Sequence, residues 1–217
     1  HSCNTYFVDL VRKLDASSLF KMSVELGFSK PIELAPNLFT AKGNLPSLKE
    51  LQNNQALANL SFGQGTLMAS PVQVSGLLNT IASGGVYRAP SLVKGLVNEN
   101  LDYILPCRKN LGKRVISSEN CEYLKKSMLD STLTGTSKRG MPDNLLAGAK
   151  TGTAQTGIKS GDRSVLQAWY AGIYPVDKPR YSIVVFVEDG RGGGETCGPI
   201  FKKLADEIYS KLPEYFG

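Results

Sequence analysis

The stretch AGAKTGTAQTG, residues 147–157, decides how this sequence is interpreted. Lys150 stands among small residues and is followed directly by Thr151, Gly152 and Thr153. A strand edge that carries a cation, two hydroxyls and a glycine suits the binding of a carboxylate next to a reacting carbonyl group. Gly152 lets a substrate backbone come close enough to lie alongside as an added strand. The backbone N–H of Thr153 is then a candidate donor to an oxyanion, so the stretch indicates acyl transfer.

A phosphate-binding loop is a second function that lysine and threonine among glycines suggest. Such a loop needs a glycine directly before the lysine and another glycine five residues earlier. Here Ala149 separates Gly148 from Lys150, and Asp143 occupies the position five before Gly148. The stretch also reads as a strand and does not open a helix, so we exclude this function.

The glycines of DGRGGGETCGP, residues 189–199, raise the question of a dinucleotide-binding loop. The pattern G-x-G-x-x-G would need glycine at position 195 or 197, where the sequence has Glu195 and Cys197. We therefore expect a flexible connection between a strand and a helix that lies over the site.

The composition is that of one soluble globular domain of 217 residues with 41% hydrophobic residues. A net charge of +6 suits anionic surroundings such as a cell wall, a membrane surface or nucleic acid, although a solvated surface explains it equally well. The absence of any block of five like charges argues against a nucleic-acid-binding tail.

The cysteines and the histidine give no metal-binding pattern. None of the four cysteines forms a C-x-x-C pair, and the single histidine is His1, so we expect no metal site. A disulfide between Cys107 and Cys121 is one pairing, but four cysteines permit three and the sequence selects none.

Helical signals dominate the first two thirds of the chain. The clearest helix has Ser70 as its N-cap, Pro71 at the first position and Gln73 completing a capping box, and it ends at Gly84. Other expected helices cover 5–14, 17–26 ending at Gly27, and 118–129 with Cys121, Leu124 and Met128 buried. Residues 28–47 read as irregular chain, and a hairpin is expected around 98–100.

Three strand-like runs and a final helix fill the last third. The runs cover 145–156, 165–175 and 180–189, and their short links favour an antiparallel meander. The tail, 198–212, predicts an amphipathic helix that packs on the sheet with one apolar stripe, formed by Ile200, Phe201, Leu204, Ile208 and Leu212. The fold class is therefore α+β.

A second motif stands at the amino end, where Ser2, Cys3 and Asn4 form an S-x-N just before a helix. Both polar residue types also occur as helix caps. Followed by K-T-G at 150–152, however, the pair matches two of the three motifs of the penicillin-interacting serine acyltransferases.

The chain resembles the C-terminal part of the transpeptidase domain of a penicillin-binding protein, most similar to the class B enzymes. The resemblance extends to 60–90, 147–157 and 169–194, which occur in the same order, and it runs from Ser2 to the final helix. It implies a β-lactamase/transpeptidase-like fold with an antiparallel sheet packed against helices, and a single domain over 1–217 whose N-terminal part is missing.

The resemblance implies a role for each motif residue. In the family a serine attacks the penultimate D-alanine carbonyl of a peptidoglycan stem peptide, and β-lactams acylate the same serine. Ser2 would relay a proton to the leaving nitrogen, and Asn4 would hydrogen-bond the substrate amide and the motif lysine. Lys150 would supply positive potential, while Thr151 and Thr153 would hold the substrate carboxylate.

The family's nucleophile motif, S-x-x-K, lies upstream of S-x-N. The two S-x-x-K strings here, 18–21 and 91–94, both follow it, and we interpret them as chance matches. We therefore expect the chain alone to be inactive, with an exposed sheet edge and exposed apolar surface. A D,D-carboxypeptidase, a β-lactamase, a β-lactam sensor and a non-catalytic wall-binding module remain alternatives.

The resemblance also implies the surroundings of the parent protein. Its partners would be stem peptides and β-lactams, with no nucleic acid and no cofactor. The parent would be anchored in the cell membrane with its catalytic domain outside the cytoplasm, in a cell-division or elongation complex.

Overall fold

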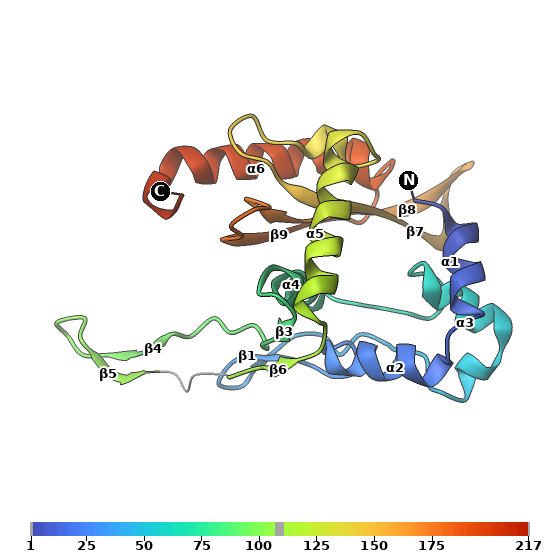
Figure 1. Cartoon of the computed structure of the whole chain (residues 1–217), viewed down its shortest axis with the longest axis horizontal. Coiled ribbons are helices and arrows are strands. Elements are labelled where there is room, and N and C mark those ends of the chain that lie inside the picture. Colours follow the sequence, from blue (N-terminus) through green and yellow to red (C-terminus); the bar gives the residue numbers. More distant parts are fainter. Residues whose placement is uncertain (1, 107–110, 217) are drawn as a thin grey trace.

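A computed structural model describes residues 2–106 and 111–216 and has the expected α+β class (Figure 1). The α-helices are α1 (Asn4–Val11), α2 (Ala16–Glu25), α3 (Asn54–Ser61), α4 (Pro71–Ala82), α5 (Ser118–Leu133) and α6 (Gly198–Lys211). The strands are β1 (Glu33–Ala35), β2 (Leu38–Phe39), β3 (Val86–Tyr87), β4 (Gly95–Val97), β5 (Tyr103–Pro106), β6 (Lys113–Arg114), β7 (Gly148–Ser160), β8 (Arg163–Tyr174) and β9 (Tyr181–Val187). Short helical turns are η1 (Glu50–Gln52), η2 (Lys138–Gly140), η3 (Gly193–Cys197) and η4 (Pro213–Tyr215).

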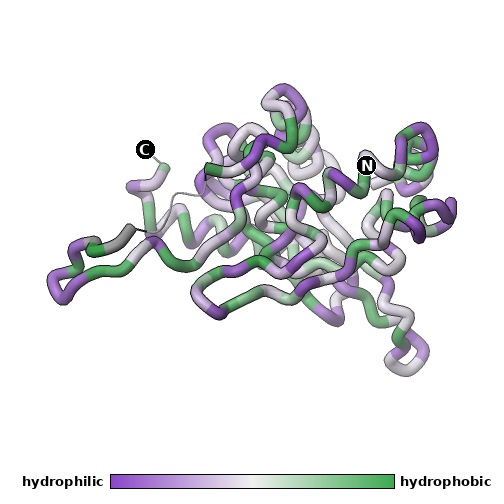
Figure 2. The backbone as a smooth tube through the Cα atoms, turned by 90° about the horizontal axis from the view of Figure 1, so that it is seen from below, coloured by the Kyte–Doolittle hydropathy of each residue, from purple (hydrophilic) through white to green (hydrophobic). Residues whose placement is uncertain are grey.

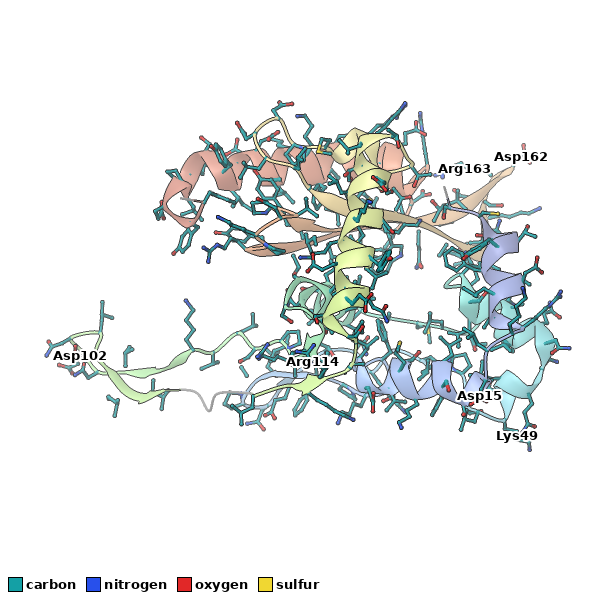
Figure 3. The ribbon with its side chains drawn as sticks, viewed as in Figure 1. Asp15, Lys49, Asp102, Arg114, Asp162 and Arg163 are labelled. Carbon is teal, nitrogen blue, oxygen red and sulfur yellow. The ribbon has the colours of Figure 1, made fainter. Side chains whose placement is uncertain are left out.

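The main sheet is the expected antiparallel meander, with strand order β7-β8-β9. Helix α6 covers one face, while α4 and α5 pack on the other (Figure 1). Because β8 is the central strand, β7 and β9 are the edge strands of this sheet within the described part of the chain. The turn between β7 and β8, marked by Asp162 and Arg163 in Figure 3, projects from the body of the protein.

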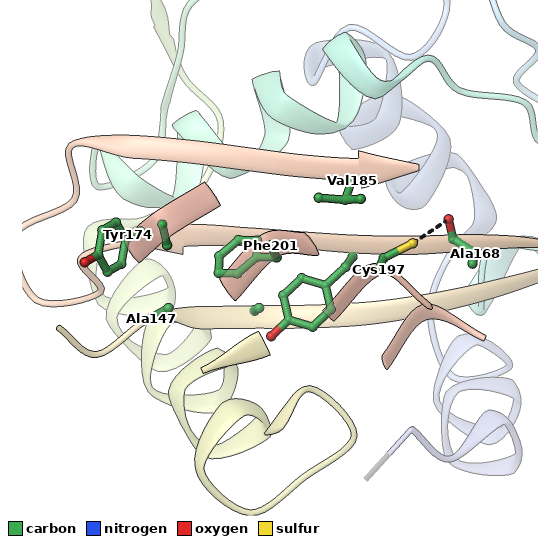
Figure 4. Packing of buried hydrophobic residues seen from close by; sticks show 9 residues of the cluster. Ala147, Ala168, Tyr174, Val185, Cys197 and Phe201 are labelled. Atoms are coloured by element: carbon green, nitrogen blue, oxygen red, sulfur yellow. Dashed lines mark hydrogen bonds between the residues drawn. The ribbon is translucent and has the colours of Figure 1, made fainter. Parts of the chain in front are cut away.

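The core between α6 and the sheet is built around Phe201, which is fully buried (Figure 4). Its ring lies 4.7 Å from the ring of Tyr170 on β8, centroid to centroid. The buried side of α6 is narrower than the sequence predicts, because Ile200 and Leu204 are each 43% exposed. The small Ala205 completes the buried face, so the helix lies close to the strands.

Helix α4 begins as predicted, with the complete capping box between Ser70 and Gln73. The Gln73 side chain is fully buried and also donates hydrogen bonds to the carbonyl oxygens of Gly27 and Lys42, at 3.0 and 3.3 Å. A buried amide with several partners stabilises one arrangement of the segments that it joins. Gln73 therefore fixes the loops after α2 against the helix that supports the sheet.

The first 70 residues form a helical lobe with a small core of its own. Its buried side chains come from α1, η1 and α3 and are Val11, Leu51, Leu57 and Leu60. Asp15, labelled in Figure 3, caps α2 by accepting a hydrogen bond from the Ser17 N–H. On α1 only Val11 is buried, whereas Tyr6 is 61% exposed, so the expected exposed apolar surface is present here.

Three local predictions need correction, and one helix is additional to those expected. Residues 28–47 are not wholly irregular, because β1 and β2 form a hairpin whose turn places Asn37 at φ 64°. Helix α3 was not predicted, since its apolar pattern is short. Helix α1 ends at Val11 rather than at residue 14. Helix α5 buries Cys121 and Met128 as predicted, but Leu124 is 40% exposed.

The hairpin predicted around 98–100 is formed by β4 and β5, and it extends away from the body of the protein (Figures 1 and 2). Asp102, labelled in Figure 3, lies near its tip. Cys107 lies outside the described residues, while Cys121 and Cys197 are buried free thiols. None of the described helices has the length and hydropathy that crossing a membrane would require.

Candidate active site

A cleft of about 600 Å³ lies between the helical lobe and strand β7. All six residues that the sequence analysis selected line this cleft, namely Ser2, Asn4, Lys150, Thr151, Gly152 and Thr153. The lobe contributes Ser2, Asn4, Phe7, Ser61, Phe62 and Gln64. The opposite side is formed by Thr136, Lys150, Thr151, Gly152, Thr153, Gly192, Gly193, Gly194 and Glu195. The structure thus brings the S-x-N and K-T-G motifs together across a single groove.

Lys150 makes the direct link between the two motifs. Its Nζ donates to Ser2 Oγ at 2.9 Å and to the Thr151 carbonyl oxygen at 2.7 Å. Because Ser2 accepts from Lys150, the hydrogen of its own hydroxyl is free to be donated into the cleft. Lys150 is an exposed residue, yet protein around its ammonium removes enough water to lower its pKa from the ordinary 10.5.

The alternation of side chains along β7 explains why this segment contributes both to the buried core and to the cleft. Ala147 and Ala149 are fully buried against α6, and Thr151 and Thr153 continue on the same face toward the cleft. Lys150 lies on the other face. The polar residues therefore begin where the strand passes beyond the cover of the core.

Thr153 is held on two sides. Its Oγ1 accepts a hydrogen bond from the Gly193 N–H at 3.2 Å, which leaves its own hydroxyl hydrogen free. Its carbonyl oxygen accepts from Gln64 Nε2, also at 3.2 Å, so that carbonyl points away from β8 and into the cleft. The N–H and C=O of one strand residue point to the same side, so the Thr153 N–H also points into the cleft.

The connection over 189–199 lies at the site, as predicted, but it is folded against β7. It contains η3, and Gly193 and Cys197 are buried. A Cβ on Gly193 would lie 2.6 Å from the Gly152 carbonyl oxygen, closer than atoms can pack, and would also clash with the Trp169 carbonyl. Gly193 therefore allows two backbone segments to pack closely, which the sequence pattern alone does not reveal.

Thr136 and Gln64 are two cleft residues that the sequence analysis missed. Thr151 Oγ1 donates to Thr136 Oγ1 at 3.0 Å. The hydroxyl hydrogen of Thr136 can therefore be donated to a ligand. Neither residue stands in a motif, and no local signal marks them. Asn4 lines the cleft and its side chain makes no hydrogen bond with another described residue.

The two S-x-x-K strings lie elsewhere. Ser18 is on α2, where its hydroxyl bonds to Asp15, and Ser91 bonds to the carbonyl oxygens of Leu34 and Val93. Neither serine lines the cleft. In the described part of the chain, no three His, Cys, Asp or Glu side chains gather in a way that could hold a metal ion.

Comparison with known proteins places these features in one family. The family model described as the penicillin binding protein transpeptidase domain matches residues 1–206. The peptidoglycan D,D-transpeptidase PbpA of Mycobacterium tuberculosis is 28% identical over 217 residues, which are 98% of this chain and 43% of that protein. The chain therefore spans less than half the length of this relative.

Solved structures show the same fold. Penicillin-binding protein A from M. tuberculosis, solved as an imipenem acyl-enzyme complex, is 25% identical with a TM-score of 0.79, covering 95% of this chain and 45% of that one. PBP2 of Helicobacter pylori, solved in complex with MreC, is 23% identical with a TM-score of 0.76, covering 97% and 39%. The likeness to PBP2 concerns the fold alone.

Replacing Gly193 tests whether the 189–199 connection shapes the cleft. In Gly193→Ala the new methyl must push this segment away from Gly152, and the hydrogen bond to Thr153 is lost. The loss of this hydrogen bond and the movement of the segment should weaken binding of a carboxylate-terminated peptide in the cleft about tenfold. The neighbouring Gly192→Ala is the control, since its Cβ would come no nearer than 3.7 Å to Thr153 Oγ1. Equal affinities of the two variants, measured by calorimetry, would contradict this packing.

The lowered pKa of Lys150 predicts a pH profile. The ammonium carries its charge only below its pKa, so affinity for a carboxylate-terminated peptide should fall as pH rises, beginning below the ordinary lysine value of 10.5. Lys150→Arg should bind more weakly but keep a flat profile, because arginine stays charged. Lys159→Arg, at the exposed far end of β7, should leave the profile unchanged. If the affinity of Lys150→Arg also fell with rising pH, the ammonium of Lys150 would not be the group that titrates.

Proposed function

The chain belongs to the penicillin-binding protein transpeptidase domain family. From this membership we propose that it forms the substrate-binding part of a peptidoglycan D,D-transpeptidase. Such an enzyme cross-links stem peptides through an acyl-serine intermediate and is acylated by β-lactams. The observation that supports this most directly is the hydrogen bond from Lys150 to Ser2 across the cleft.

The carboxylate of a terminal D-alanine would bind beside Lys150. The ammonium supplies positive potential, and the Thr153 hydroxyl, which accepts from Gly193, would donate its own hydrogen to the same carboxylate. Thr151 would contribute through Thr136, because its own hydrogen is already donated to that residue. Gly152, with no side chain, lets the substrate backbone approach the strand.

The reacting carbonyl would lie next to the Thr153 N–H, which would donate to the developing oxyanion. Ser2 would pass a proton to the departing D-alanine nitrogen, since its hydroxyl accepts from Lys150 and has its hydrogen free. Asn4, whose side chain has no described partner, would bind the amide of the substrate. An amine from a second stem peptide would then resolve the acyl-enzyme.

The nucleophilic serine would come from a part of the protein outside these 217 residues. Both S-x-x-K strings of this sequence lie away from the cleft, so neither supplies an attacking hydroxyl there. The parent would be anchored in the cell membrane with this domain outside the cytoplasm. PBP2 of H. pylori binds MreC, and a comparable elongation or division complex is proposed for the parent.

Labelling with a fluorescent penicillin tests this function. The 217-residue chain alone should not become covalently labelled, because removing an attacking serine from such a site costs several orders of magnitude in rate. The full-length protein encoded by the gene should be labelled, and Lys150→Ala should reduce its labelling rate at least about a hundredfold, as for loss of one electrostatic donor.

Product analysis with a stem-peptide substrate separates the alternatives. A cross-linked dimer identifies a transpeptidase, whereas release of D-alanine alone identifies a carboxypeptidase. Stable labelling of the isolated chain, or a full-length protein that penicillin never labels, would contradict the proposal.

A further inference from the structure

The hydrogen bond between Gln64 and Thr153 crosses the cleft at the position where a ligand would pair with β7. Gln64 Nε2 lies 3.2 Å from the Thr153 carbonyl oxygen, although the two residues are 89 positions apart. Together with the bond between Lys150 and Ser2, it joins β7 to the helical lobe.

The loop that carries Gln64 is built to present this one side chain. Gly63 and Gly65 flank it with φ of 77° and 79°, a backbone conformation that other residues rarely adopt. The Gln64 N–H is bonded to the Asn59 carbonyl oxygen at 2.9 Å, which ties the loop to the end of α3. A Cβ on Gly65 would touch Asn59, so the loop is also packed closely against the helix. The side chain itself is half-buried.

The Gln64 carboxamide and an added strand would compete for the same space. A peptide that pairs with the free edge of β7 lies about 4.7–4.9 Å away and places its N–H about 2.9 Å from an acceptor oxygen. The carboxamide already lies at that distance from the Thr153 carbonyl, on the same side of the strand. A ligand amide that pairs with this edge of β7 therefore competes with the Gln64 carboxamide for the Thr153 carbonyl oxygen.

We infer that Gln64 is a specificity-determining residue that closes the acceptor position of Thr153 in the empty cleft and yields it to ligands carrying a backbone amide. The inference rests on the proposed function. A ligand without that amide leaves Gln64 bonded to Thr153 and is unaffected by its loss. A ligand with the amide must break the bond, at a cost comparable with the hydrogen bond that it forms.

Acylation of the full-length protein by two β-lactams measures this competition. Benzylpenicillin carries an acylamino N–H, whereas imipenem carries a hydroxyethyl group in its place. In Gln64→Ala the acylation rate constant for benzylpenicillin, divided by that for imipenem, should rise about 2- to 10-fold, the factor expected for one net hydrogen bond. The ratio cancels any general change in the cleft or in folding.

Two further variants complete the test. Gln64→Glu keeps the length but cannot donate, so its ratio should rise as well, even though its charge slows both anionic compounds. Gln55→Ala, on the exposed side of α3, should leave the ratio unchanged. Measurable acylation with an unchanged or lower ratio in both Gln64 variants would overturn this inference alone. A wild-type protein that neither compound acylates would overturn the proposed function and this inference with it.

Discussion

The contact between the Lys150 ammonium and the Ser2 hydroxyl is the interaction on which the site depends. It joins two parts of the chain 148 residues apart, and the cleft exists only while the helical lobe and β7 hold these groups at hydrogen-bonding distance. The same surroundings lower the pKa of Lys150, because the ammonium is partly removed from water without a carboxylate partner. Its described partners, the Ser2 hydroxyl and the Thr151 carbonyl, are both neutral, so its charge remains available to a ligand carboxylate.

The rest of the fold holds the two sides of the cleft, β7 and the helical lobe, in place. On one side Ala147 and Ala149 bury the start of β7 under α6, so the strand enters the cleft from a rigid core. On the other side Gln73 ties the loops of the helical lobe to α4, which supports the opposite face of the sheet. The position of the candidate site residues therefore follows from packing and from a few buried hydrogen bonds, and rigid elements suit a site of this kind.

The sequence predicts the elements whose signals are local and strong. The capping box of α4, the meander of β7 to β9 and the two motifs need only short-range patterns. The stripe on α6 was predicted too wide, because periodicity counts Ile200 and Leu204 as buried without knowing what covers them. Thr136, Gln64 and the close packing of Gly193 could not be predicted, since each depends on contacts between distant segments. The structure gathers the six candidate site residues around one cleft, and their roles in catalysis are proposed.

A double-mutant cycle on Ser2 and Lys150 measures whether the two side chains act together across the cleft. Rate constants for acylation of the full-length protein by benzylpenicillin would be measured for wild type, Ser2→Ala, Lys150→Met and the double variant. Residues that share a hydrogen bond in one site should show a coupling energy of about 0.5–3 kcal/mol, so the double variant loses less than the two single losses combined. Losses that add within about 0.3–0.5 kcal/mol would show that the two side chains act independently, and would contradict the account.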